Sequence, residues 1–89
     1  MNKTNELLII TMEECGELIQ ACSKLMRFAG EKDVDKKKLA EGLVRLRMEA
    51  ADVQCMINLM TERELIDRKE MGKMVLDKRK KLKKYSNLF

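Results

Sequence analysis

Four carboxylic acids form two pairs with the same spacing. Glu14 and Glu17 are three residues apart, and Glu49 and Asp52 repeat that spacing. On a helix, residues three apart project from neighbouring turns of one face. Carboxylate oxygens are the ligands that hard cations such as Mg²⁺ and Mn²⁺ prefer. If two helices bring these four side chains together, the acid quartet they form could hold a divalent cation.

The helical phase places one acid of each pair among apolar side chains. On a wheel of 100° per residue with Glu14 at zero, the apolar residues fill an arc from about −40° to +140°, and Glu17 lies at about −60°. With Glu49 at zero, the apolar arc runs from about −20° to +120°, and Asp52 again lies at about −60°. Burying an unpaired carboxylate is costly. A single such acid would favour pairing with a base or reaching solvent, but the matched set favours a bound cation.

Zinc and iron chemistry fit this chain poorly. The cysteines, Cys15, Cys22 and Cys55, are odd in number, and the sequence contains no histidine. Cys15 and Cys22 are seven residues apart, about 10 Å along a helix, which is too far for one tetrahedral zinc site. A di-iron carboxylate bundle needs a histidine three residues after a glutamate on two helices. We therefore expect reduced, buried cysteines and no iron or oxygen chemistry.

The acids and their neighbours resemble the signature of a known enzyme family. The segments EECGE (13–17) and EAAD (49–52) are similar to the EExxE and ExxD motifs of the MazG-like, all-α nucleoside triphosphate pyrophosphohydrolases. The likeness extends over the flanking stretches EECGELIQACSKLMR and EAADVQCMINLM. It implies an enzyme that hydrolyses a nucleoside or deoxynucleoside triphosphate to the monophosphate and pyrophosphate. The acid quartet would then supply the catalytic metal ligands, with Mg²⁺ as cofactor and Mn²⁺ as a substitute.

The resemblance also suggests residues that support the quartet. Glu13 matches the first acid of EExxE, but it lies at about −100° on the wheel, so we expect it to support the ligands rather than bind the metal. The family often places a base near the end of its last helix against the phosphates. Lys78 and Lys81, which share one helix face, are the candidates there. Lys24, at about −80° beside Glu17, is a third candidate phosphate ligand.

Length and composition favour one small helical domain. The chain has 89 residues and no proline, with 45% hydrophobic and 38% charged residues. This composition predicts an all-α fold, a single domain over 1–89 with three to four helices. The uncharged stretches are too short to span a membrane, and the start MNKTNELLII lacks a signal-peptide pattern. We therefore expect a cytoplasmic protein without a membrane partner.

Capping signals and glycines predict where the helices begin and end. Gly30 is expected to follow the first helix in the left-handed conformation, and Asp33 or Asp35 to cap the second. Thr61 and Asp67 each precede a glutamate by three residues, which is the spacing of a capping box. A turn or short helix is expected over 61–66. The predicted helices run from Thr4 or Asn5 to Phe28, from Lys36 to Met60, and over 68–85.

The charge is unevenly distributed along the chain. Residues 1–67 carry 10 basic and 13 acidic groups, whereas residues 68–89 carry nine basic groups and two acidic ones. A basic helix end is usually a solvated one, and it could also bind phosphates. A nucleic-acid-binding module is one alternative function, but it leaves the buried acids unexplained, and few aromatic residues are available for base stacking. We therefore do not expect a nucleic-acid partner.

A second apolar strip on the helix over 36–60 points to assembly. Val44, Met48, Cys55 and Leu59 lie on one side of the wheel, away from the strip that carries Glu49. About three helices from a chain of this size cannot cover both strips well. We expect a core completed by homo-oligomerisation, as a homodimer or homotetramer. A non-catalytic helical dimer is the other alternative, and it predicts no binding of divalent metal ions.

Overall fold

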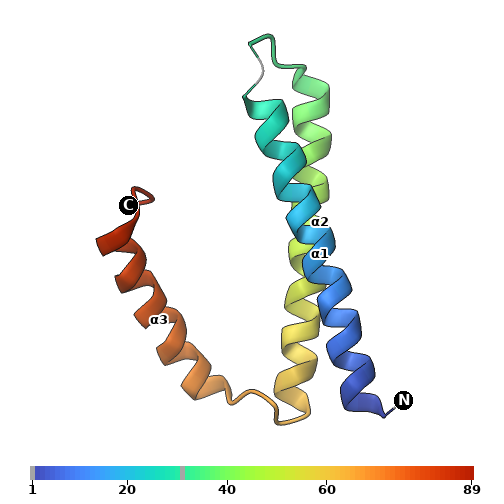
Figure 1. Ribbon diagram of the computed structural model, residues 1–89, viewed down its shortest axis with the longest axis vertical. Coiled ribbons are helices and arrows are strands. Elements are labelled where there is room, and N and C mark those ends of the chain that lie inside the picture. The colour runs from blue at the N-terminus through green and yellow to red at the C-terminus, as the bar shows by residue number, and fades with distance from the viewer. Residues whose placement is uncertain (1, 31) are drawn as a thin grey trace. The chain divides into compact units, whose positions relative to one another are not determined.

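Three α-helices make up the computed structural model, which describes residues 2–30 and 32–89 (Figure 1). α1 spans Lys3–Ala29, α2 spans Lys36–Glu62 and α3 spans Arg68–Tyr85. No strand occurs in these two ranges, so the predicted all-α fold class is confirmed. Over the same ranges, no helix combines the length and the apolar character needed to cross a lipid bilayer.

Contacts within the chain divide it into two compact units, Met1–Leu59 and Met60–Phe89. In the first unit, α1 and α2 run antiparallel and side by side, joined at one end by a short connection (Figure 1). The second unit holds the last residues of α2, a turn and α3. The acid quartet therefore lies wholly within the first unit.

Most of the buried and half-buried residues of the α1–α2 hairpin follow a heptad pattern. On α1 and on α2 this subset recurs at alternating intervals of three and four residues, which is the repeat of two helices packed along a seam. Glu14 and Glu49 both occupy seam positions. The seam positions are Thr4, Leu7, Thr11, Glu14, Leu18, Ala21, Leu25 and Phe28 on α1, and Leu39, Gly42, Leu46, Glu49, Val53, Met56 and Met60 on α2.

The core of this hairpin is small. Among the described residues, the buried hydrophobic ones are Leu7, Ala21 and Met56. Close packing is clearest near the connection, where Gly42 of α2 lies against Phe28 of α1. A Cβ atom built on Gly42 would be 3.5 Å from Phe28 Cδ2, an ordinary van der Waals distance. The ring of Phe28 therefore packs closely against α2, and an added Cβ at position 42 would meet it without a clash.

The apolar arc predicted for α1 is only partly covered. Ile19 and Met26, at its far edge, are 69% and 75% exposed. Cys15 and Cys22 lie on the same side, and all three cysteines are exposed, so the prediction of buried cysteines is wrong for the single chain. The reason is geometric, since one neighbouring helix covers a stripe of α1 and not an arc of about 180°.

The N-terminal caps of the helices are side-chain oxygens. Asn2 caps α1, accepting a hydrogen bond from the Asn5 backbone N–H at 2.7 Å. The helix therefore begins at Lys3, slightly before the predicted start at Thr4 or Asn5. Asp35 caps α2, accepting hydrogen bonds from two backbone N–H groups in the first turn of α2, which confirms one of the two predicted residues.

The C-terminal end of α1 differs from the prediction. Gly30 has φ −87° and ψ −6°, so the predicted left-handed conformation is wrong. Its N–H instead donates to the Met26 carbonyl, which continues the helical pattern by one residue.

α2 ends in a Schellman motif. The Leu65 N–H donates to the Met60 carbonyl and the Glu64 N–H donates to the Thr61 carbonyl, while Glu64 adopts a left-handed φ of 62°. Thr61 therefore lies in the last turn of α2 and does not cap a further helix. Asp67 does cap α3, where its Oδ2 accepts a hydrogen bond from the Glu70 N–H at 2.8 Å. The predicted bounds of the last helix, 68–85, are confirmed.

Candidate metal centre

The hairpin brings all four carboxylates of the acid quartet together. One carboxylate oxygen from each of the four residues lies within 4.8 Å of the others. Two neighbouring turns of α1 supply one pair and two neighbouring turns of α2 supply the other. The shared helical phase seen in the sequence explains this, because antiparallel helices packed along a seam turn equivalent edges to the same side.

The quartet has an inner and an outer layer. Glu14 and Glu49 lie in the seam and are half-buried, whereas Glu17 and Asp52 lie at its edge and are exposed. Within the described residues, Glu14 Oε2 and Glu49 Oε2 are inaccessible to solvent and accept no hydrogen bond. Buried oxygens of this kind carry a desolvation cost that a cation or a donor must offset. The quartet thus combines two unsatisfied inner oxygens with an open outer side.

Burial and the charges of neighbouring acids raise the pKa values of both inner acids. For Glu14, the main cause of the raised pKa is desolvation, and the charges of Glu17, Asp52 and Glu13 add to it. For Glu49, desolvation again comes first, followed by a side-chain hydrogen bond to Glu17, which favours the protonated form of Glu49, and by repulsion from the charges of Glu17 and Asp52. Each inner carboxyl therefore holds its proton more tightly than an isolated glutamate does.

Within the described residues, one base forms an ion pair with an acid of the quartet. Arg45 is one turn before Glu49 on α2, and its Nε is 3.9 Å from Glu49 Oε1. This guanidinium lowers the pKa of Glu49, but it does not outweigh the causes that raise it. One base beside four carboxylates leaves the site with an excess of negative charge, which suits a divalent cation.

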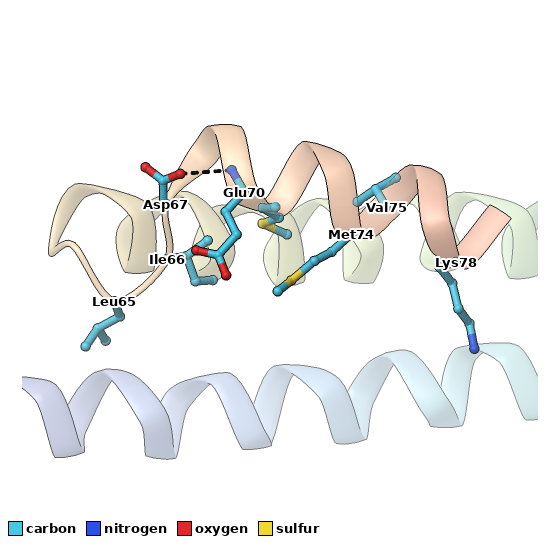
Figure 2. Close-up of a pocket in the computed structure, with 8 residues that line it drawn as sticks. Leu65, Ile66, Asp67, Glu70, Met74, Val75 and Lys78 are labelled. Atoms are coloured by element: carbon cyan, nitrogen blue, oxygen red, sulfur yellow. Dashed lines mark hydrogen bonds between the residues drawn. The ribbon is translucent and has the colours of Figure 1, made fainter. Parts of the chain in front are cut away.

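The other predicted site residues fall into different environments. Glu13 is exposed next to the quartet, and its charge raises the pKa of Glu14. Lys24 lines a hollow between α1 and α2. Lys78 lines a largely apolar pocket of the second unit, beside Met74 and Val75 (Figure 2). Because Lys78 and Lys81 belong to the second unit, their role as phosphate ligands stays a prediction.

Two basic residues that share a hollow with Lys24 were not predicted from the sequence to be site residues. Arg45 and Lys38 line the same hollow as Lys24. On the wheel centred on Glu49 they lie at about −40° and −20°, on the same side as Asp52. Their position on the helical wheel is therefore the sequence signal for their place beside the acids. Many other lysines and arginines in the chain make this signal weak.

No protein-family model, curated protein or solved structure matches this chain.

Proposed function

We propose that this protein hydrolyses a nucleoside or deoxynucleoside triphosphate to the monophosphate and pyrophosphate, using a divalent cation bound by the acid quartet. The observation that carries the proposal is the pair of buried, unpartnered oxygens on Glu14 and Glu49, in a cluster whose four oxygens lie within 4.8 Å of one another. Acidic clusters are common on protein surfaces, but two inaccessible carboxylate oxygens with no donor are a reason for a cation to bind.

The donor set fits Mg²⁺, with Mn²⁺ as a substitute. All four candidate ligands are carboxylates, and the chain contains no histidine. Hard cations with oxygen ligands match such a set, whereas zinc and iron sites draw on imidazole or thiolate ligands. The exposed outer acids, Glu17 and Asp52, leave one side of the site open to a substrate.

The proposed reaction is a water attack on the α-phosphorus. A bond forms from the water oxygen to that phosphorus, and the bond to the oxygen that bridges the α- and β-phosphates breaks. This bridging oxygen leaves with pyrophosphate, and the water proton is released to solvent. When bound, the cation supplies charge neutralisation along the phosphate chain and a lower pKa for a coordinated water.

The protein contributes position and environment. The seam holds Glu14 and Glu49 on two rigid helices, which fixes their carboxylates relative to each other. Their partial burial excludes water from the inner side of the site, so a charged ligand there is screened less than at an open surface. The choice of pyrophosphohydrolase over other metal-dependent hydrolases comes from the resemblance of EECGE and EAAD to the family motifs.

Assembly is part of the proposal. Val44 and Met48 on α2 are 51% and 62% exposed, as expected if their strip packs against another copy of the chain. A homodimer or homotetramer would bury this strip together with the uncovered apolar edge of α1. A helix with apolar residues on two sides then lies inside a larger bundle.

The test of the reaction is a panel of nucleoside and deoxynucleoside triphosphates incubated with Mg²⁺. Products are separated by anion-exchange chromatography in the absence of any added pyrophosphatase. We expect the monophosphate and pyrophosphate in equal amounts, and no turnover once EDTA is present. Orthophosphate as the first product would refute the assigned reaction, and equal rates in EDTA would refute the role of the metal.

A further inference from the structure

A hollow lined by basic residues lies between α1 and α2, on the side of the quartet nearer to their connection. We call it the basic hollow. Three cationic side chains, Lys24, Lys38 and Arg45, line it, and Glu41 is the acid among its lining residues. Phe28 and Gly42 also line it. A concave surface with an excess of positive charge is suited to an anionic ligand.

Arg45 connects the basic hollow to the acid quartet. Its side chain lines the hollow, and its Nε is 3.9 Å from Glu49 Oε1. On α1, Lys24 follows Glu17 by seven residues, which is two turns or about 10 Å along the same side of the helix. Arg45 therefore borders both sites, and the helical phases of Lys24 and Glu17 put these two residues on the same side of α1.

The opposite charges of these two sites suit different parts of one ligand. A triphosphate bound at the quartet shares its charge with the cation there, while its remaining phosphates need other positive groups. The quartet itself repels uncompensated phosphate oxygens. The basic hollow offers three cations next to it, and lysine and arginine are the side chains that bind phosphates most readily.

We propose that the basic hollow binds the pyrophosphate part of the triphosphate, that is, its β- and γ-phosphates. This inference rests on the proposed function, and it identifies the residues that select a triphosphate over a monophosphate. Lys24 and Lys38 are exposed, so their ammonium groups are free to reach a ligand in the hollow. The nucleoside then lies on the other side of the quartet, away from the connection.

A nucleoside in the hollow is the competing occupant, because Phe28 could stack on a base. Phe28 is half-buried, however, and its Cδ2 lies 3.5 Å from where a Cβ of residue 42 would be. This packing against α2 gives the ring a structural role. The hollow has three cationic side chains and one acidic one, and this excess of positive charge, which a neutral base would leave uncompensated, favours the phosphates.

The test is calorimetric titration of inorganic pyrophosphate into the full chain in the presence of Mg²⁺. We compare wild type with Lys24→Gln and Lys38→Gln, and use Lys37→Gln as the matched control, since Lys37 is an exposed lysine of α2 outside the hollow. Loss of one charged contact is expected to weaken pyrophosphate binding by about tenfold in each hollow variant. The control variant and the binding of Mg²⁺ alone are expected to be unchanged.

Three results would overturn the inference. One is a failure of the wild type to bind pyrophosphate while it hydrolyses triphosphates. Another is pyrophosphate affinity that is equal in wild type and in both hollow variants. The third is binding of an unphosphorylated nucleoside that is lost in these variants. A different result would refute the proposed function itself, namely a wild-type protein that neither binds Mg²⁺ nor releases pyrophosphate from triphosphates.

Discussion

Glu14 and Glu49 lie opposite each other across the seam of α1 and α2, and each has one solvent-inaccessible oxygen, Oε2, that no donor within the described residues satisfies. Desolvation of each carboxylate, together with the nearby charges of Glu17 and Asp52, opposes the packing of the helices that carry them. Charged and with these oxygens unpartnered, the two carboxylates lower the stability of the fold, and a bound cation would offset this cost. The two unsatisfied oxygens of Glu14 and Glu49 are therefore the main support for a metal-binding role of the quartet.

Each member of the acid quartet is expected to be essential for turnover. Replacing Glu14, Glu17, Glu49 or Asp52 by its amide removes a charged ligand and should lower kcat by on the order of 100-fold or more. Circular dichroism should show unchanged helical content. Glu62→Gln, an exposed acid of α2 outside the quartet, is the control and should keep full activity. Full activity in any two of the four amide variants would contradict the four-ligand site.

The raised pKa of Glu14 predicts a specific dependence of stability on pH without metal. Because the folded state holds this proton more tightly than the unfolded state, folding is favoured at low pH, and stability falls as pH rises above the ordinary value of 4.5. Glu14→Gln lacks this ionisation. In EDTA, the Tm of Glu14→Gln minus that of wild type should therefore grow from acidic to neutral pH. If the difference between the two Tm values stays constant over this pH range, the pKa of Glu14 is not raised in the folded protein.

Much of the fold could be predicted from the sequence, because its signals are local. Asp67 with its capping spacing defined the start of α3, and the bounds 68–85 agree with the structure. The common phase of the two acid pairs predicted that their carboxylates would meet, and the structure brings them within 4.8 Å. Binding of a metal there stays a prediction, since proximity alone does not demonstrate it.

Other features depend on packing that no local pattern specifies. Asn2 and Asn5 are equally good capping residues, and only the hydrogen bond between them shows which one caps α1. The helical wheel identifies an apolar arc on α1, but it does not show how much of that arc α2 covers. The exposure of Cys15 and Cys22 could therefore not be predicted from the wheel. The basic hollow needs residues of both helices at once, so it became visible only when the seam was known.

The end of α2 offers a test of its Schellman motif. Glu64 has a left-handed φ of 62°, a conformation that costs an L-residue with a side chain more than it costs glycine. We expect Glu64→Gly to raise the free energy of unfolding by about 0.5 to 1 kcal/mol, as measured by urea denaturation. Glu62→Gly, inside the last turn of α2, should instead lower it by about 1 kcal/mol. Equal destabilisation by both substitutions would contradict the left-handed turn.

Assembly can be tested on the exposed strip of α2. Met48→Glu and Leu59→Lys place charges where another copy is proposed to pack; these side chains are 62% and 37% exposed in the single chain. Sedimentation velocity should show a shift toward monomer or a loss of folded protein. Lys37→Gln, outside the strip, should leave the sedimentation coefficient unchanged. An unchanged oligomer of unchanged stability in both strip variants would place the interface elsewhere.

The most direct test of the metal centre is a set of thermal melts of wild type, Glu14→Gln and Glu49→Gln, each in EDTA and in excess Mg²⁺. In EDTA both variants should melt above wild type, because each relieves one buried charge of its repulsion and desolvation. In Mg²⁺ the order should reverse, since only wild type gains the full binding free energy of the cation. If both variants instead melt below wild type in EDTA, and Mg²⁺ does not change the order, the acids form structural bonds and the quartet is not a metal centre.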